Sequence, residues 1–187
     1  MWEADTIRFI CENLAKGGDV IHAGTYFGDF LPALSASCVP GAKVWAFEPN
    51  PESFLCARAT ASLNACENVN LFHAALTDAD GTIRVVTMGP TGRSLGGLSH
   101  VSTDEGSMEV PARMIDNTFP LDRRVSVLQL DLEGHEASAI TGAIGTIERC
   151  RPVVIVESLP PPALKTLFDL GYRVLSKVDG NTTLVYG

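Results

Sequence analysis

The chain has 187 residues and a mass of 19.9 kDa, and 45% of its residues are hydrophobic and 19% charged. This composition is typical of globular proteins, and we expect one domain over residues 1–187. The net charge is −8, and no basic run is longer than the pair Arg123 and Arg124. We therefore expect no nucleic-acid partner, and since no apolar run has the length of a membrane span, no membrane partner.

The compartment is predicted from the N-terminal segment and the cysteines. Residues 1–19 lack the apolar core and cleavage site of a secretory signal. The five cysteines are scattered and show neither a CxxC pair nor a zinc-like spacing. We therefore expect small buried thiols in a cytoplasmic protein.

Strand-like and helix-like segments alternate along the chain. An amphipathic helix is expected before Gly17, and buried strands are expected at 19–23, 43–48, 68–76, 125–133 and 152–157. The first connecting helix should begin at Asp29 as N-cap and the second at Asn50, with Pro51 in the first helical position. One further helix should carry Ile140, Ile144 and Ile147 on one face.

The alternation is interrupted between the third and fourth buried strands. Strands are expected at 82–86 and 108–115, the second as an edge strand because it contains Pro111. Between them, residues 87–107 are rich in Gly, Ser and Thr, and we expect a lid or an acceptor-recognition loop there. A hairpin of 172–178 and 182–187 ends the chain. The pattern predicts an α/β fold with a mostly parallel sheet, helices on both faces and an antiparallel C-terminal strand.

The segment "VIHAGTYFGDF" (20–30) forms the turn after the first strand, where an open parallel sheet binds its ligand. A dinucleotide turn needs a glycine at the point where Thr25, Tyr26 and Phe27 stand, because the backbone there approaches a pyrophosphate. We therefore expect a nucleoside ligand without phosphates. Glu48 ends the second strand about 20 residues later, where an acid can accept hydrogen bonds from ribose hydroxyls. Alternatively, Glu48 is only an acidic residue that precedes the start of the next helix.

Six segments carry a resemblance to a known family. These are "VIHAGTYFGDF", "VWAFEPNPESF", "NVNLFHAALTDADG", "EVPARMIDNTF", "VLQLDLEGHEASAITGA" and "RPVVIVE". In order and spacing they resemble FkbM-type S-adenosylmethionine-dependent methyltransferases. The resemblance implies the Rossmann-like class I methyltransferase fold, with seven strands of which the last is antiparallel, and it implies S-adenosylmethionine as cofactor and S-adenosylhomocysteine as product.

The resemblance also implies roles for particular residues. Gly24, Tyr26 and Gly28 would hold the methionine part of the cofactor, and Glu48 would hold the ribose. Pro49 and Asn50 would lie beside the adenine, and Ala74 and Ala75 would meet its edge. Asp131 would line the pocket where the methyl group meets its acceptor. We expect the whole turn to contribute to cofactor binding, including His22, Thr25, Phe27 and Asp29.

The turn departs from the family at one position. The family usually begins it with Asp-Val-Gly-Ala-Asn, whereas this chain has His22, Ala23, Gly24, Thr25 and Tyr26. The missing Asp would have helped to hold the cofactor's ammonium group. His22 cannot supply that negative charge, and Asp29 is the candidate replacement.

Catalytic candidates follow the fourth and fifth buried strands. Methyl transfer needs the acceptor oxygen, the methyl carbon and the sulfur in line, and a base for the hydroxyl proton. His135 is our preferred base because its ordinary pKa is near neutral, although it can equally be a residue that only starts the next helix. Glu133 is a candidate for binding the acceptor hydroxyl, and Glu157 either lines the acceptor pocket or pairs with an Arg. A divalent metal on Asp131, Glu133 and His135 is conceivable, but nothing in their spacing demands it.

We therefore expect methyl transfer to a hydroxyl oxygen, and the resemblance implies a small polyhydroxylated acceptor, such as a sugar or a polyketide-type metabolite. Two alternatives remain open. A divergent nicotinamide-dependent oxidoreductase would need a phosphate-cradling turn, which is absent. A non-catalytic binding protein with a degenerate methyltransferase fold is compatible with the altered segment 22–26.

Overall fold

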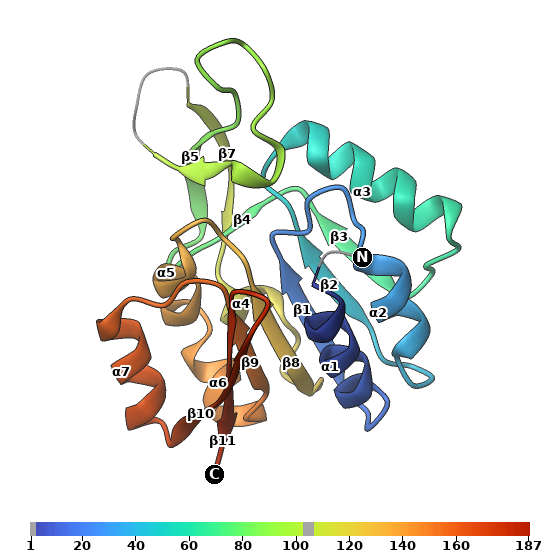
Figure 1. The fold of residues 1–187 in the computed structure, drawn as a ribbon, viewed down its shortest axis with the longest axis vertical. Coiled ribbons are helices and arrows are strands. Elements are labelled where there is room, and N and C mark those ends of the chain that lie inside the picture. Colours follow the sequence, from blue (N-terminus) through green and yellow to red (C-terminus); the bar gives the residue numbers. More distant parts are fainter. Residues whose placement is uncertain (1–2, 103–106) are drawn as a thin grey trace.

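The computed structural model describes residues 3–102 and 107–187, so residues 103–106 of the predicted loop lie outside the described residues. The described chain forms a seven-stranded sheet with helices on both faces and a smaller four-stranded sheet beyond one end of it (Figure 1).

The helices and strands have the following bounds. The helices are α1 (Ala4–Leu14), α2 (Leu31–Ser37), α3 (Pro51–Leu63), the 3₁₀ turn η1 (Gly96–Leu98), α4 (Ile115–Thr118), α5 (Glu136–Thr141), α6 (Ile144–Cys150) and α7 (Pro161–Asp169). The strands are β1 (Asp19–Ala23), β2 (Val44–Phe47), β3 (Val69–Phe72), β4 (Ala75–Leu76), β5 (Gly81–Val86), β6 (His100–Val101), β7 (Met108–Arg113), β8 (Val125–Leu130), β9 (Val153–Val156), β10 (Tyr172–Val178) and β11 (Asn181–Tyr186).

The large sheet has the strand order β10-β11-β9-β8-β1-β2-β3. Its strands β3, β2, β1, β8 and β9 are parallel, and the last strand, β11, runs antiparallel between β9 and β10. The chain order reverses between β1 and β8, so this is where an open α/β sheet forms its ligand crevice. The predicted fold class is confirmed, including the antiparallel C-terminal strand.

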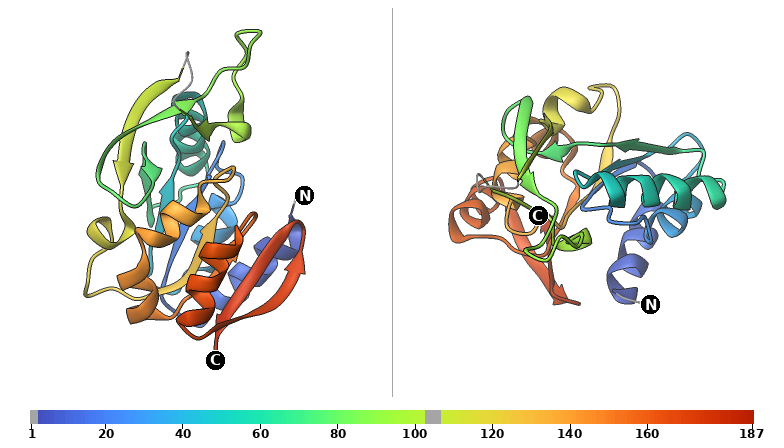
Figure 2. Two further views of the ribbon diagram at one scale, coloured as in Figure 1. Left: turned by 90° about the vertical axis from the view of Figure 1, so that its left-hand side faces the viewer. Right: turned by 90° about the horizontal axis from the view of Figure 1, so that it is seen from above.

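The two faces of this sheet are buried under different helices, as Figure 2 also shows. Alternate side chains of a strand point to opposite faces. Val20 therefore packs in the cluster that contains Ile10 of α1 and Leu34 of α2. Its neighbour Ile21 packs with Ile140 of α5 and the residues of α6 and α7. Because both faces are covered, the central strands are mostly apolar, and their polar residues Asp19, His22 and Gln129 are buried.

The two predicted N-caps differ in outcome. Asn50 caps α3, since its Oδ1 accepts hydrogen bonds from the backbone N–H of Glu52 at 2.9 Å and of Ser53 at 3.3 Å. The prediction that Asp29 caps α2 is wrong. The backbone N–H of Leu31 already bonds to the carbonyl of Gly28, and Phe30 has helical dihedral angles, so the turn begins earlier and α2 has no side-chain cap.

Two predicted elements are divided in the structure. The segment 68–76 is not one strand: β3 belongs to the large sheet and β4 to the small one. The helix predicted to carry Ile140, Ile144 and Ile147 is two helices that break at Gly142. Gly142 packs against the carbonyl oxygen of Thr77, where a Cβ would lie at 2.0 Å, and its own carbonyl accepts a hydrogen bond from the backbone N–H of Asp116 at 3.0 Å instead of continuing the helix.

The small sheet has the order β4-β7-β5-β6 and contains part of the predicted loop. Residues 87–102 include a bridge between Met88 and Ser94, the turn η1 and strand β6, so they are more ordered than predicted. The prediction that Pro111 places its strand at an edge is wrong, because β7 has β4 and β5 as neighbours. Pro111 is tolerated because β4 pairs only with Ala112 and Arg113.

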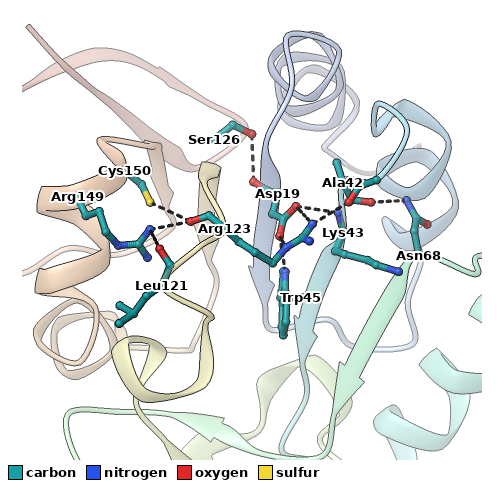
Figure 3. A network of polar contacts seen from close by, with 11 residues as sticks. Asp19, Ala42, Lys43, Trp45, Asn68, Leu121, Arg123, Ser126, Arg149 and Cys150 are labelled. Carbon is teal, nitrogen blue, oxygen red and sulfur yellow. Dashed lines mark hydrogen bonds and ion pairs between the residues drawn. The ribbon is translucent and has the colours of Figure 1, made fainter.

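Asp19 organises the end of the sheet opposite the ligand crevice (Figure 3). Its carboxylate accepts hydrogen bonds from Arg123 Nε at 2.5 Å and Nη2 at 2.7 Å, and from Trp45 Nε1 at 2.8 Å. The backbone N–H of Lys43 donates to the same carboxylate at 2.9 Å. The side chain of Asp19 is 3% exposed, so this network ties β1 to β2 and to the start of β8.

None of the helices in the described residues is long and apolar enough to cross a membrane. All five cysteines are free thiols. The expectation that they are buried is confirmed for Cys66 and Cys150, whereas Cys11 and Cys38 are half-buried and Cys56 is exposed on α3.

We expect Asp19→Asn to lower the free energy of unfolding by about 2–4 kcal/mol, because it leaves the partly buried Arg123 without its counter-charge. Asp5→Asn is the matched control. Asp5 pairs with Arg8 on the surface, so its loss should cost less than about 1 kcal/mol. Urea unfolding measures both, and equal effects would contradict the role given to the Asp19 network.

Candidate functional site

A cavity of about 620 Å³ opens at the carboxyl ends of β1, β2, β8 and β9, beside the reversal in strand order. The sequence-predicted residues that line it are His22, Gly24, Tyr26, Phe27, Asp29, Glu48, Pro49, Ala74, Ala75, Asp131, Glu133, His135 and Glu157. The glycine turn and Glu48 supply one part of its wall, and the residues after β8 and β9 supply another.

Gly24 brings the ends of β1 and β8 into direct contact. Its φ is +82°, and a Cβ there would lie 1.9 Å from the carbonyl oxygen of Asp131. The backbone N–H of Asp131 donates to the carbonyl of Ala23 at 3.1 Å. Only glycine fits this approach, which sets Asp131 on the cavity wall beside the turn.

Glu48 is buried and shapes the turn from the end of β2. Its Oε2 accepts a hydrogen bond from the backbone N–H of Tyr26 at 2.7 Å, and its Oε1 accepts one from Asn50 at 2.8 Å. Burial raises the pKa of Glu48 to about 7, although these two hydrogen bonds oppose the shift. Each carboxylate oxygen retains a lone pair for a ligand hydroxyl.

His22 is a neutral residue in the floor of the cavity. It is 2% exposed. Burial lowers its pKa to about 4, although the hydrogen bond with Gln129 favours a higher value. Its Nδ1 bonds to Gln129 Oε1, while its Nε2 is buried and has no partner among the described residues. His22 therefore offers no charge, and Asp29 is the carboxylate that this turn contributes to the wall.

Three residues of the predicted cofactor set do not line the cavity. Thr25 is buried, and its hydroxyl donates to the carbonyl of His22 at 3.3 Å. Gly28 faces α3, because a Cβ there would lie 2.9 Å from the Cα of Ala57. Asn50 caps α3 with its Oδ1. These three residues support the turn and the helix beside it, so their contribution to a ligand site is indirect.

Residues 95–99 cover part of the cavity, and we call them the roof segment. A Cβ at Gly96 would lie 2.7 Å from Cε2 of Tyr26, so the Tyr26 ring packs on the glycine backbone. The Nδ2 of Asn50 donates to Ser99 Oγ at 2.8 Å. Tyr26 therefore joins the roof segment to the glycine turn. Three polar residues of the predicted loop, Arg93, Ser94 and His100, do not line the cavity.

Three carboxylates converge after β8 and β9. Oxygen atoms of Asp131, Glu133 and Glu157 lie within 4.8 Å of one another. Burial, and then the charge of Glu157, raise the pKa of Asp131 to about 8. Burial and the charge of Glu157 also raise the pKa of Glu133. Asp131 therefore holds a proton more readily at neutral pH than an ordinary carboxyl group does, which lowers the negative charge of the cluster.

His135 lies beside this cluster, at the N-cap of α5. Its Nε2 lies 3.2 Å from Thr77 Oγ1. Burial lowers the pKa of His135, and the negative charges of Asp78 and Glu136 offset part of this shift. His135 is thus neutral and available to accept a proton. His135 points to Thr77 and not to the carboxylates. The side chains that converge are therefore those of Asp131, Glu133 and Glu157, and not the metal set considered from the sequence, which had His135 in place of Glu157.

Sequence reasoning missed the cavity-lining polar residues Glu3, Gln129 and Asp179, and it missed Thr77, which contacts His135. Gln129 lines the cavity and lies opposite His22 in the β1–β8 register. A signal for it existed, since it is a lone amide in the apolar segment "VLQL". Thr77 bonds to a residue 58 positions away, and its local sequence carries no such signal.

Comparisons with known proteins show the family and the fold of the chain. The Methyltransferase FkbM domain family matches residues 22–174. The structure resembles the methyltransferase FkbM from Methylobacillus flagellatus, with a TM-score of 0.60 and 17% identity over 91% of this chain, which spans 44% of that one. No curated protein sequence matches.

Two further structures share the fold. An rRNA methylase from Streptococcus thermophilus has a TM-score of 0.57 and 13% identity, covering 99% of this chain and 94% of that one. The O-methyltransferase TomG from Streptomyces achromogenes, in complex with S-adenosylmethionine, has a TM-score of 0.57 and 11% identity, covering 99% and 81%. Because rRNA methylases share the fold, it gives no support for excluding a nucleic-acid acceptor.

We expect Gly24→Ala to destabilise the chain by more than about 3 kcal/mol, because it combines a backbone clash with an unfavourable φ. Gly41→Ala is the control: Gly41 has a φ of +87° with nothing near its Cβ position, so only the conformational cost of about 1 kcal/mol applies. Urea unfolding compares them, and a Gly24 variant as stable as the Gly41 variant would contradict the close approach.

Proposed function

Because the chain belongs to the FkbM methyltransferase family, we propose that it transfers a methyl group from S-adenosylmethionine to a hydroxyl oxygen of a small molecule. The proposal treats residues 1–187 as one methyltransferase domain. The observation that carries it is a single cavity with a nucleoside-type turn in one part of its wall and proton-accepting groups in another.

The cofactor would lie along the turn after β1. Glu48 can accept hydrogen bonds from both ribose hydroxyls, and Pro49, Ala74 and Ala75 provide an apolar wall for the adenine. The methionine part would pass Gly24 toward His22. Asp29, on the cavity wall, can supply the negative charge for the ammonium group that His22 lacks.

The acceptor would lie between the cofactor and the residues after β8. The hydroxyl proton needs a base, and neutral His135 is our candidate. Asp131 and Glu157 can accept hydrogen bonds from neighbouring hydroxyls of the same acceptor, while the in-line placement of the acceptor oxygen supplies much of the rate enhancement.

The charge of the cavity favours a small acceptor over a nucleic acid. Its described lining includes Asp29, Glu48, Asp131, Glu133 and Glu157 but contains neither Lys nor Arg. A phosphate backbone would meet repulsion there, because nucleic-acid sites neutralise phosphates with basic side chains. A polyhydroxylated acceptor that is uncharged or carries an amine suits this wall. The likeness to rRNA methylases makes RNA the second candidate.

The two remaining alternatives have less support. A nicotinamide-dependent oxidoreductase needs backbone room for a pyrophosphate, and residues 25–27 fill that position with side chains. A non-catalytic binding protein would have no need for a neutral histidine beside a carboxylate cluster in the same cavity.

We expect calorimetric titration with S-adenosylhomocysteine to give stoichiometric binding that Glu48→Gln weakens about 10–100-fold, because the variant loses a charged acceptor for the ribose. Ionised Glu48 accepts these bonds better, so wild-type affinity should rise between pH 6 and pH 8, and the Gln variant should not show this rise. Glu52→Gln, on the exposed first turn of α3, is the control. Binding of NAD(H) and none of S-adenosylhomocysteine would contradict the proposal.

For the acceptor, we expect radiolabelled methyl transfer from S-adenosylmethionine to appear on sugars, amino sugars or hydroxylated macrolides and not on rRNA. The physical reason is the acidic cavity wall, which repels phosphates. Incorporation into rRNA alone would establish the second candidate and contradict the first.

A further inference from the structure

The hydroxyl group of Thr77 lies between a carboxylate and the imidazole of His135. Thr77 Oγ1 donates a hydrogen bond to Asp78 Oδ1 at 3.1 Å, and His135 Nε2 lies 3.2 Å from the same oxygen. Thr77 is 5% exposed and is not a cavity-lining residue, whereas His135 is. Thr77 therefore contacts the imidazole of His135 from outside the cavity.

The direction of these hydrogen bonds follows from counting protons. An ionised carboxylate only accepts, and a threonine hydroxyl has one proton to donate. Since that proton goes to Asp78, the hydroxyl oxygen meets His135 with its lone pairs. The proton between Thr77 and His135 must then belong to Nε2, which leaves Nδ1 of a neutral imidazole as a free acceptor. No described residue forms a hydrogen bond with Nδ1.

We propose that Thr77 and Asp78 are positioning residues that hold His135 in its Nε2–H tautomer, so that Nδ1 accepts the proton of the acceptor hydroxyl. This inference rests on the proposed function for its catalytic consequence. The tautomer itself is a property of the protein without any ligand.

The backbone around Thr77 is held on both sides. Its N–H donates to the carbonyl of Arg113 at 3.0 Å, directly after the pairing of β4 with β7. Its carbonyl packs on Gly142, where a Cβ would come within 2.0 Å. The same glycine separates α5 from α6, so the helix break makes room for the segment that orients His135, the N-cap residue of α5.

In the proposed step the acceptor oxygen forms a bond to the methyl carbon as the carbon–sulfur bond breaks, and sulfur keeps the electron pair as a thioether. The acceptor O–H bond breaks and its proton moves to His135 Nδ1. The resulting imidazolium keeps its Nε2–H bond to Thr77, and the charge of Asp78 favours this cationic form.

Long-range ¹H–¹⁵N spectra of the labelled protein test the tautomer directly, because they distinguish a protonated ring nitrogen from an unprotonated one. The chain has four histidines, and His135→Gln identifies the signal of interest. Above the pKa of His135, we expect Nε2 to be protonated and Nδ1 not. Thr77→Val should give a mixture of tautomers, and Thr77→Ser, which keeps the hydroxyl, should restore the wild-type pattern.

Thr141→Val is the control, since the Thr141 hydroxyl bonds only within α5 to the carbonyl of Ala137. It should leave the His135 signal unchanged. An Nδ1–H tautomer in the wild type, or a wild-type pattern in a folded Thr77→Val protein, would overturn the positioning role.

With a methyl acceptor in hand, Thr77→Val should lower kcat at least tenfold, Thr77→Ser should recover most of it, and the affinity for S-adenosylhomocysteine should stay at the wild-type value in both. An unchanged kcat in Thr77→Val would overturn the catalytic consequence. A wild-type protein that does not bind S-adenosylhomocysteine would instead contradict the proposed function, while the tautomer measurement would still decide the positioning role.

Discussion

The contact between Gly24 and the backbone of Asp131 is the constraint on which the rest of the site depends. The strands β1 and β8 lie side by side where the strand order reverses, and their ends can meet only because Gly24 has no side chain. This contact starts the glycine turn and brings the first of the three carboxylates to the same cavity. A bound cofactor and the groups that act on its methyl group would therefore share one rigid backbone junction.

Burial controls the charge of the site. His22 is neutral because it is buried, and the buried Glu48 and the half-buried Asp131 hold protons more tightly than exposed acids do. A carboxylate cluster next to a neutral imidazole is an arrangement in which small changes of pH move protons. At the opposite end of the sheet, Asp19 is buried against Arg123 and has a structural role. The two ends thus use buried acids for different purposes.

Much of the fold was predictable, because it follows from local rules. The alternation of apolar segments predicted the parallel strands, Asn50 before Pro51 predicted the start of α3, and the final hairpin predicted the antiparallel strand. The predictions failed where distant segments decide the outcome. At the helix break, the carbonyl of Gly142 bonds to the backbone N–H of Asp116, which comes from another part of the chain.

The candidate site follows the same division. The spacing from the glycine turn to Glu48 predicted that both line one cavity, as they do. The sequence did not reveal that Thr25, Gly28 and Asn50 turn away from that cavity, because their side chains and backbone are used by the neighbouring helix and turn. Nor did it reveal the pairing of Asp131 with Glu157, since those residues lie on separate strands.

We infer that one cavity brings a methyl donor to the groups after β8. A crystal structure with S-adenosylhomocysteine measures this directly. We expect ribose hydroxyls on Glu48 and a sulfur atom beside Gly24 that faces the space between Asp131 and His135. A cofactor bound elsewhere, or with its sulfur turned away from these residues, would contradict it.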